Sequence, residues 1–305
     1  MDFIIFVVSM GVLILGAEFI IQQSEKIALH FGISHFVIGA TLIALGTSLP
    51  EMAVSMSASM AGSGDIAVAN VIGSTVFNVS LVLGATFLVA KNINPTRDLF
   101  AKDSAWALFP ILVFILMSLD GQLNYVDGIL FLILMGAYLL FLIGSNQVEE
   151  IDDEILNEKF NWGKSLPLLL VGFAFVIGGA DFAIDSAGNI AREFGISEWV
   201  IGMFLVAFGT SLPELTISIK SAMKNNADMA IGNIIGSNVA NFTMVLGASS
   251  IVNALNVNLS ENFFDIAAAF IVSLMLVFIT ANRLYNKSAG IVLMVVLALV
   301  VQNSL

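Results

Sequence analysis

The stretch Gly46-Thr47-Ser48-Leu49-Pro50-Glu51 lies inside an apolar segment long enough to cross a membrane, and the same six residues recur at Gly209 to Glu214. Proline lacks an N–H and its ring clashes with the carbonyl group four residues earlier, so Pro50 leaves the Gly46 carbonyl without its helical partner. Unpaired backbone groups at membrane depth persist only where protein buries them or where they line a polar cavity. The hexapeptide therefore predicts an interrupted membrane helix at each of two places.

Each proline is followed by a carboxylate, at Glu51 and at Glu214. An ionisable side chain at membrane depth is costly and by default marks a functional site. Freed carbonyl oxygens beside a carboxylate form the hard oxygen shell that Ca2+ or Na+ prefers. A second interpretation is a capping box, with Ser48 or Ser211 as the N-cap of the half-helix that follows the break. We therefore interpret each hexapeptide as half of a cation site in which the serine also caps the helix.

The composition is that of a membrane protein: 58% of the residues are hydrophobic, 11% are charged and the mean hydropathy is +0.98. Soluble domains carry about 25% charged residues. Apolar runs of about 20 residues match the thickness of the bilayer core. We predict an all-α polytopic protein with ten transmembrane helices, of which the second and the seventh are broken. The predicted spans are 3–22, 36–60, 66–90, 104–118, 127–144, 165–190, 199–223, 229–254, 263–281 and 287–303.

Several classes of function lack the residues that they need. The chain has no cysteine, and His30 and His35 do not form a zinc-binding pattern, so thiolate and zinc chemistry have no ligands. No nucleophile–base pair or metal triad indicates an enzyme, and no cofactor is expected. The net charge of −12 argues against a nucleic-acid partner. The first apolar run has no basic leading segment or cleavage site and is expected to stay as a helix.

The basic residues fall almost entirely on one side of the predicted membrane. If the N-terminus is on one side, the connections on the opposite side hold ten of the eleven Lys and Arg residues, and only Arg192 is on the side of the N-terminus. Positively charged connections face the cytoplasm. We therefore predict a protein of the cell (inner or plasma) membrane with both termini outside the cytoplasm and the connection 145–164 inside.

The chain contains an internal repeat. Residues 16–85 align without a gap with residues 179–248, an offset of 179 − 16 = 163, and Phe31-Gly32-Ile33-Ser34 then meets Phe194-Gly195-Ile196-Ser197. We predict a five-helix repeat at 1–144, an acidic cytoplasmic linker at 145–164 and a second repeat at 165–305. Because five is odd, the second repeat is inverted, and inverted repeats with broken helices indicate a secondary transporter with a site at the repeat interface. Duplication kept only for packing would explain the Gly and Ser residues but not Pro-Glu.

Polar side chains recur at helical spacing around each hexapeptide. Four residues apart, such side chains share one face of a helix. The first repeat has the rows Thr47, Glu51, Ser55 and Asn70, Ser74, Asn78; the second has Thr210, Glu214, Ser218 and Asn233, Ser237, Asn241. Asn70 and Asn233 are equally well interpreted as ties between helices. If the rows of the two repeats face each other across the repeat interface, two carboxylates lie close to several hydroxyl and amide groups.

These residues carry a resemblance to a known family. Two copies of Gly-Thr-Ser-Leu-Pro-Glu, each followed by Gly-Ser-x-x-x-Asn, resemble the α-repeats of the sodium/calcium exchanger family among the calcium/cation antiporters, and the chain resembles a prokaryotic-type member. The resemblance covers essentially the whole chain. It implies exchange of Na+ for Ca2+, with Ca2+ extruded from the cytoplasm by alternating access at a midplane site. It also implies that the first and sixth helices slide against the other eight.

The resemblance also implies a set of ligands. Ca2+ would be held by Glu51 and Glu214 with the carbonyl groups of Thr47 and Thr210. Na+ would be bound by residues of both repeats, namely Ala44, Ser48, Ser74, Asn78, Ala207, Ser211, Ser237 and Asn241. Because both ions would use the same carboxylates, they are expected to compete. The substrates are thus Ca2+ and Na+, and the expected state is a monomer in a lipid bilayer.

Asn241 departs from the pattern of some family members, which carry Asp at this position. With Asn78 and Asn241 both neutral, the two glutamates neutralise one Ca2+, and three Na+ would leave an excess positive charge. Such exchange would be electrogenic, and K+ co-transport is disfavoured.

A proton-driven antiporter on the same scaffold is the nearest alternative, because a glutamate at a low dielectric constant can carry H+. A passive cation channel is disfavoured by the inverted, broken repeats.

The acidic run from Glu149 to Glu158 has two interpretations. It is expected to be a solvated linker between the repeats, because it is short and lacks the spacing and the turn glycine of an EF-hand. A cytosolic calcium sensor is the alternative.

Overall fold

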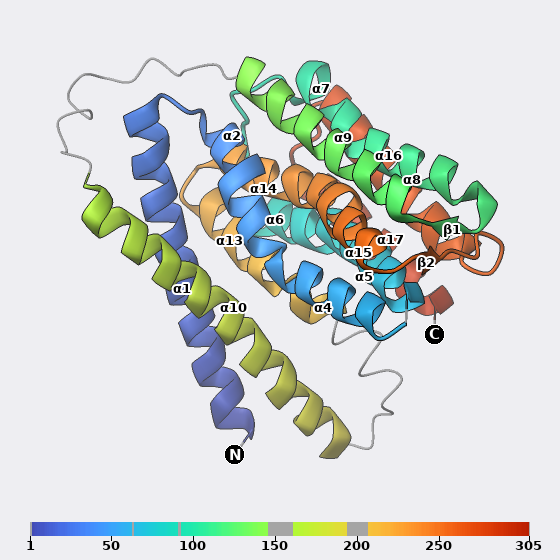
Figure 1. Cartoon of the computed structure of the whole chain (residues 1–305). Coiled ribbons are helices and arrows are strands. Elements are labelled where there is room, and N and C mark those ends of the chain that lie inside the picture. Colours follow the sequence, from blue (N-terminus) through green and yellow to red (C-terminus); the bar gives the residue numbers. More distant parts are fainter. Residues whose placement is uncertain (1, 63, 91–92, 146–160, 194–206, 305) are drawn as a thin grey trace.

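The protein is a bundle of α-helices in a computed structural model that describes residues 2–62, 64–90, 93–145, 161–193 and 207–304 (Figure 1). The first half contains α1 (Asp2–Phe31), α2 (His35–Ile38), the π-helical turn η1 (Gly39–Ile43), α3 (Ala44–Thr47), α4 (Leu49–Met60), α5 (Gly64–Phe77), π-helical η2 (Asn78–Leu83), α6 (Gly84–Val89), α7 (Leu99–Lys102), α8 (Ser104–Met117), the short 3-10 turn η3 (Ser118–Asp120) and α9 (Tyr125–Gly144). The second half contains α10 (Trp162–Glu193), α12 (Ala207–Thr210), α13 (Leu212–Met223), α14 (Ala227–Ala240), π-helical η6 (Asn241–Val245), α15 (Leu246–Val252), α16 (Phe263–Ala281) and α17 (Lys287–Ser304). The acidic run 149–158 lies outside the described residues.

Two short strands that the hydrophobic pattern did not predict connect the halves. β1 (Gln122–Leu123) pairs antiparallel with β2 (Leu255–Asn256), with Leu123 opposite Leu255. Both leucines are fully buried. The pair joins two connections between helices. Over the residues described, all other regular elements are helices.

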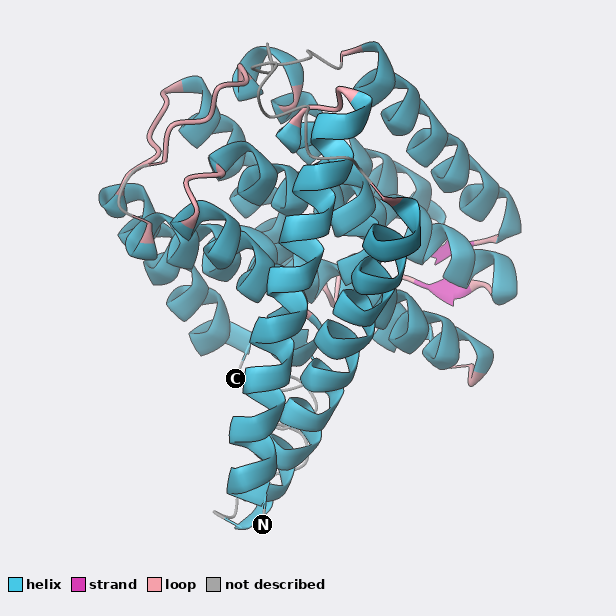
Figure 2. Cartoon of the chain, turned by 90° about the vertical axis from the view of Figure 1, so that its left-hand side faces the viewer, coloured by secondary structure: helices cyan, strands magenta, loops and turns pink. Residues whose placement is uncertain are grey.

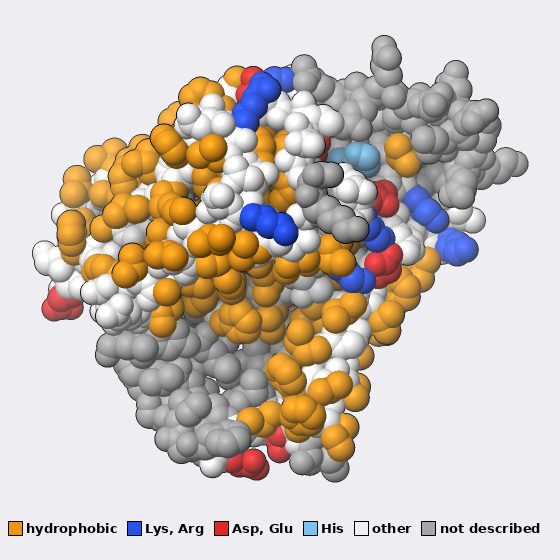
Figure 3. All heavy atoms as spheres, turned by 180° about the vertical axis from the view of Figure 1, so that it is seen from behind, with side chains coloured by type: hydrophobic (Ala, Val, Ile, Leu, Met, Phe, Trp, Pro, Cys, Tyr) orange, Lys and Arg blue, Asp and Glu red, His pale blue; other side chains and the backbone are white. Residues whose placement is uncertain are grey.

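The helix lengths confirm a multispanning membrane protein. Among the residues that the structure describes, seven helices are long and apolar enough to cross a bilayer, and the bent pair His35–Thr47 and Leu49–Met60 makes an eighth candidate. Lys287–Asn303 is a shorter apolar helix. The predicted span 199–223 is described only from residue 207 onward. Hydrophobic side chains cover broad stretches of the face shown in Figure 3, as expected for a surface in contact with lipid.

Helices α1 and α10 form a layer of their own on one side of the bundle (Figures 1 and 2). They run in opposite directions: Gly16 of α1 approaches Gly172, and Asp2 at the start of α1 accepts a 3.0 Å hydrogen bond from Asn189 near the end of α10. A Cβ atom on Gly16 would lie 2.7 Å from the Gly172 carbonyl oxygen, so only glycine permits this approach. The buried apolar side chains of the layer belong to clusters separate from the main core.

Both hexapeptides interrupt a helix at the serine. Ser48 has φ −82° and ψ 5°, Ser211 has φ −86° and ψ 1°, and a new helix begins at the next residue in each case. The first pair of helices is bent by 43°. Pro50 and Pro213 fall in the first turn of the new helices, where a missing N–H leaves no helical bond unmade. The predicted breaks are therefore present, each two residues before the proline of its hexapeptide.

Each half also contains a π-helical turn that begins at a predicted site asparagine. η2 begins at Asn78 and η6 begins at Asn241, which are related by the repeat offset, 241 − 78 = 163. The insertion of an extra residue into an α-helix is frequent at functional sites. The hydrophobic pattern contained no signal for these turns.

Gly236 of α14 permits a close contact with η1. A Cβ atom at this position would lie 2.5 Å from the Ala40 carbonyl oxygen. We expect Gly236→Ala to force the two helices apart, to cost about 1–3 kcal/mol of stability and to lower the melting temperature in detergent. Gly136→Ala on α9 is the matched control, since no atom lies within 4 Å of its added Cβ. Wild-type melting of Gly236→Ala would contradict the packing described.

Candidate cation-binding site

Glu51 and Glu214 are the two carboxylates at the centre of the bundle. Each lies in the first turn of the helix that follows a break, α4 and α13 respectively, and each is fully buried. The two carboxylates are close enough to interact electrostatically. The helix N-termini beneath them favour negative charge. The structure thus brings together the two glutamates that the repeat predicted.

Hydroxyl groups connect the two halves around Glu214. Ser48 donates a hydrogen bond of 3.4 Å to Glu214 Oε1, and Ser237 donates one of 3.3 Å to the same oxygen. Thr47 Oγ1 lies 3.5 Å from Ser237 Oγ and 3.2 Å from the Ala44 carbonyl oxygen, to which it donates. Residues from both hexapeptides therefore share one polar cluster.

The predicted capping box is wrong at both breaks. The side chains of Ser48 and Ser211 make no capping hydrogen bond to the helix that follows. The Ser48 hydroxyl instead crosses to Glu214, and the Ser211 hydroxyl is buried with no hydrogen-bond partner among the described residues. Neither hydroxyl therefore caps the helix that follows it.

Several buried oxygen atoms of the predicted ligands have no hydrogen-bond partner among the residues described. Buried polar atoms are almost always paired, so each such atom calls for a ligand, a water or an ion. We define the oxygen cluster as the unpartnered side-chain oxygens of Glu51, Ser74, Asn78, Ser211, Glu214 and Asn241. Carboxylate, hydroxyl and amide oxygens are the donors that Ca2+ and Na+ take. The donor set of the oxygen cluster therefore fits hard cations.

Asn70 and Asn233 connect neighbouring helices. Asn70 donates to Ser55 Oγ at 3.0 Å and to the Glu51 carbonyl oxygen at 3.3 Å, and Asn233 donates to Ser218 Oγ at 3.0 Å. The two serine contacts are equivalent under the repeat offset. These contacts tie neighbouring helices, but the Asn70 Oδ1 is buried with no partner among the described residues and the Asn233 Oδ1 accepts from Thr47 Oγ1 at 3.4 Å, so both interpretations of these asparagines stay open.

Of the two alanines predicted to bind Na+, Ala44 already has hydrogen bonds at its carbonyl oxygen. The Ala44 carbonyl oxygen accepts bonds from Ser48 N at 3.0 Å and from Thr47 Oγ1. Ala207 is the first residue of α12, directly after the segment 194–206 that lies outside the described residues. For the Ala44 carbonyl oxygen to bind Na+, it would have to give up one of these hydrogen bonds or accept it together with the ion.

Comparison with known proteins identifies the family. The family model for the sodium/calcium exchanger protein matches residues 1–144 and 164–304. The chain belongs to this family. An uncharacterized membrane protein of Methanocaldococcus jannaschii, MJ0091, is 38% identical over 89% of this chain and 87% of its own length. The sodium/calcium exchanger MaX1 of Methanosarcina acetivorans is 29% identical over 96% of this chain and 95% of its own. The structure of the sodium-calcium exchanger NCX_Mj soaked with 10 mM Na+ and zero Ca2+ superimposes with a TM-score of 0.86 at 34% identity, covering 99% of this chain and 98% of that one.

Membership in the sodium/calcium exchanger family establishes the broad activity. The chain is a membrane transporter of the cation-antiport class, with Na+ and Ca2+ as the ions of its family, and it is not an enzyme. The predicted family resemblance is thereby confirmed.

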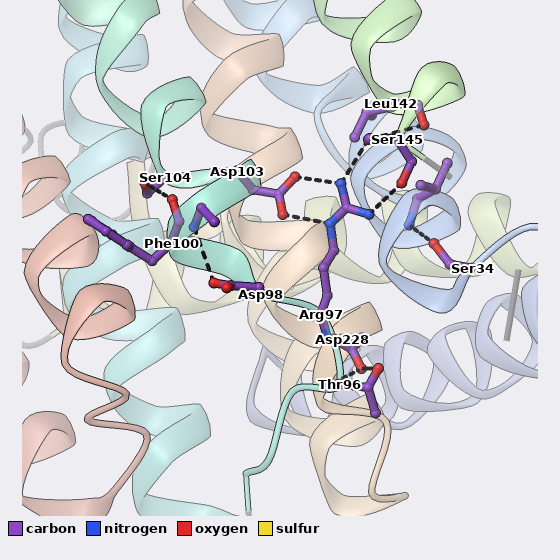
Figure 4. Close-up of polar contacts among 12 residues, drawn as sticks. Ser34, Thr96, Arg97, Asp98, Phe100, Asp103, Ser104, Leu142, Ser145 and Asp228 are labelled. Carbon is purple, nitrogen blue, oxygen red and sulfur yellow. Dashed lines mark hydrogen bonds and ion pairs between the residues drawn. The ribbon is translucent and has the colours of Figure 1, made fainter. Parts of the chain in front are cut away.

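Sequence reasoning missed a second polar network, shown in Figure 4. Arg97 forms a buried bidentate pair with Asp103 at 2.6 and 2.9 Å and donates to the carbonyl and hydroxyl oxygens of Ser145 at the end of α9. Its guanidinium lies 4.6 Å from the ring centre of Phe36 in α2. Asp228 of α14 accepts bonds from the backbone N–H groups of Thr96 and Arg97. The network joins the ends of several helices on one side of the bundle.

Proposed function

We propose that this chain exchanges Na+ for Ca2+ at the oxygen cluster and extrudes Ca2+ from the cytoplasm. The observation that carries the proposal is the convergence of two buried carboxylates, one from each hexapeptide, with hydroxyl and amide oxygens that have no hydrogen-bond partner among the described residues. Two carboxylates balance the charge of one Ca2+. A buried pair of anions without cationic partners is unfavourable, so a bound cation stabilises the site.

The proposed ligand sets divide the site between the two ions. Glu51 and Glu214, with the carbonyls of Thr47 and Thr210, hold Ca2+. The Na+ ligands are Ala44, Ser48, Ser74, Asn78, Ala207, Ser211, Ser237 and Asn241. Because the carboxylates serve both ions, Na+ and Ca2+ displace each other. Hydroxyl bonds such as those from Ser48 and Ser237 to Glu214 are weak at 3.3–3.4 Å and can be exchanged for a cation.

The proposed architecture is ten membrane spans in two inverted five-helix repeats, 1–144 and 165–305. Three observations support it. The first helices of the halves, α1 and α10, run in opposite directions (Figure 1). The helix breaks at Ser48 and Ser211 have the same backbone geometry. The π-helical turns begin at positions related by the repeat offset.

The proposed orientation places both termini outside the cytoplasm. On the face shown in Figure 3 the Lys and Arg side chains lie in the upper part, down to about mid-height and with acidic side chains among them, whereas the charged side chains visible at the lower end, where α1 begins, are acidic. The end of α9 and the start of α10 lie at the upper end in Figure 1. The positive-inside tendency then assigns the upper end to the cytoplasm.

Alternating access is proposed to occur by movement of the α1–α10 layer against the rest of the bundle. The buried apolar side chains of this layer are not part of the main core, and they share two smaller clusters with residues of the facing helices, such as Ile38, Ile217 and Met229. On its cytoplasmic part the layer is attached to α13 by ion pairs of Glu18 with Lys220, at 3.0 Å, and with Lys224. These pairs are about a quarter to a third exposed and are therefore weak enough to exchange.

Uptake of calcium-45 into proteoliposomes tests the proposed function. Vesicles loaded with Na+ and diluted into Na+-free buffer are expected to take up Ca2+ at clamped pH, and dissipation of the Na+ gradient is expected to stop the uptake. Uptake that follows a pH gradient and ignores Na+ would favour a proton antiporter. Uptake without any counter-ion would indicate a channel, and either result would contradict sodium exchange.

Asn241→Asp tests the role of charge in the site. A third carboxylate beside the oxygen cluster would attract Na+, and one charge at about 6 Å contributes on the order of 3 kcal/mol at an effective dielectric constant near 20. We expect the Na+ concentration for half-maximal uptake to fall at least about tenfold and the charge moved per Ca2+, measured as voltage dependence, to change. Asn303→Asp on the exposed end of α17 is the control. Unchanged Na+ dependence and transported charge in Asn241→Asp would contradict the assignment.

A further inference from the structure

Asn238 is a buried amide of α14 that the sequence pattern did not single out. Its residue is 3% exposed, and its Oδ1 accepts a 3.1 Å hydrogen bond from Nδ2 of Asn78. Asn78 begins η2 in the other half of the chain and is one of the proposed Na+ ligands. The bond therefore connects the two halves beside the oxygen cluster.

This bond determines which atom of Asn78 remains available. An asparagine amide offers two donor hydrogens on nitrogen and one acceptor oxygen. Because Nδ2 of Asn78 donates to Asn238, the Oδ1 of Asn78 is left buried with no partner among the described residues. Only the oxygen can bind a cation. If the Asn78 amide group were rotated by half a turn, Nδ2 would face the oxygen cluster. Its hydrogen atoms would then repel Na+ and compete with Na+ for the carboxylate oxygens.

Among the residues that the structure describes, the other side of the site has no equivalent tether. The repeat offset places Thr75 where the second half has Asn238, since 238 − 163 = 75. The Thr75 hydroxyl donates to the Val71 carbonyl of its own helix at 2.9 Å. Both amide atoms of Asn241 are accordingly unpartnered among the described residues. The two site asparagines are equivalent in sequence but not in their surroundings.

We propose that Asn238 is a positioning residue that holds the Asn78 carbonyl oxygen toward Na+ and so sets Na+ affinity on one side of the site. The inference rests on the proposed sodium exchange. Asn238 itself does not bind the ion. Among the described residues nothing holds the Asn241 amide, so it can reorient toward whichever ion is bound. The Asn78 amide is already oriented before the ion binds. Pre-organisation of a ligand of this kind raises affinity because the ordering cost has already been met in folding.

Removing the tether should affect Na+ alone. Asn238→Thr places at this position the side chain that α5 already accommodates at Thr75, and Asn238→Leu provides a second variant with the same number of side-chain heavy atoms and no hydrogen-bonding group. We expect either change to raise the Na+ concentration for half-maximal calcium-45 uptake about three- to tenfold, the range for one lost hydrogen bond. The half-saturating Ca2+ concentration and the maximal rate should change by less than about twofold. Thr75→Val, at the corresponding position of the first half, is the matched control.

A double-mutant cycle distinguishes positioning from general structural damage. If Asn238 acts only through Asn78, the Asn78→Ala/Asn238→Thr double variant has the Na+ dependence of Asn78→Ala alone. Additive losses, equal losses for Na+ and Ca2+, or wild-type Na+ dependence in both Asn238 variants would overturn the proposal. The wild-type protein is measured first: absence of Na+-driven uptake there would refute the proposed function, whereas Na+-driven uptake with unaltered variants would refute only the role of Asn238.

Discussion

Glu51→Gln and Glu214→Gln are each expected to abolish Ca2+ transport. Both carboxylates are buried, and each supplies half of the charge that would neutralise one Ca2+. At about 4 Å and an effective dielectric constant near 20, one carboxylate charge attracts a unit charge by about 4 kcal/mol and the divalent Ca2+ by about 8 kcal/mol. Its removal is therefore expected to weaken Ca2+ binding at least about 100-fold, and calcium-45 uptake into Na+-loaded proteoliposomes measures the loss.

The glutamine substitutions separate charge from structure. A glutamine at position 214 keeps an oxygen that can accept from Ser48 and Ser237, so the packing around it is preserved. Glu261→Gln, on an exposed connection, is the matched control and is expected to transport normally. Equal melting temperatures in detergent would show that both site variants fold. Normal Ca2+ flux in either Glu51→Gln or Glu214→Gln would refute the assigned ligands.

Arg97→Met is expected to produce the largest loss of stability. Asp103 is fully buried. Among the described basic residues, only Arg97 lies within ion-pairing distance of its carboxylate. Removal of one partner from a buried ion pair leaves an uncompensated charge and costs about 3–5 kcal/mol. The substitution also removes the contact with the Phe36 ring and the two bonds to Ser145. Thermal unfolding in detergent or bilayer measures the change.

A compensating substitution identifies the cause of that loss. The Arg97→Met/Asp103→Leu double variant removes both charges and is expected to recover much of the stability, because a buried ion pair replaced by apolar side chains is often close to neutral. Arg283→Met, at an exposed position, is the control. If Arg97→Met unfolds like the wild type, or if the double variant is less stable than the single one, the network does not have the structural role described here.

The sequence was most informative where the chemistry is local. Pro50 and Pro213 located both breaks, although a proline alone does not end a helix here, since Pro110 lies inside α8 and Pro167 lies inside α10. The recurrence of the whole hexapeptide at a fixed offset located Glu51 and Glu214. Apolar length located the helices, although α1 continues to Phe31, beyond the predicted end at residue 22. Lipid-facing and protein-facing segments are both apolar, so hydropathy alone does not indicate where a helix leaves the membrane.

The features that sequence reasoning missed depend on contacts between distant segments. The Ser48 hydroxyl was expected to cap its own helix, but Glu214 from the other half offers a charged acceptor. Repeat comparison detects only residues that recur, so Asn238, whose counterpart is Thr75, gave no signal. Arg97 was counted only as a cytoplasmic charge, because its partners Asp103 and Ser145 belong to different helices. A search for polar residues that break the repeat would have found Asn238.

The most direct test of a single site shared by two ions is equilibrium Ca2+ binding to the purified protein at increasing Na+ concentration. One Ca2+ is expected to bind per chain, with an apparent Kd that rises continuously as Na+ is added and with no complex that holds the full complement of both ions. Glu51→Gln and Glu214→Gln are each expected to remove the high-affinity binding. A Ca2+ Kd that is independent of Na+ would contradict the shared site.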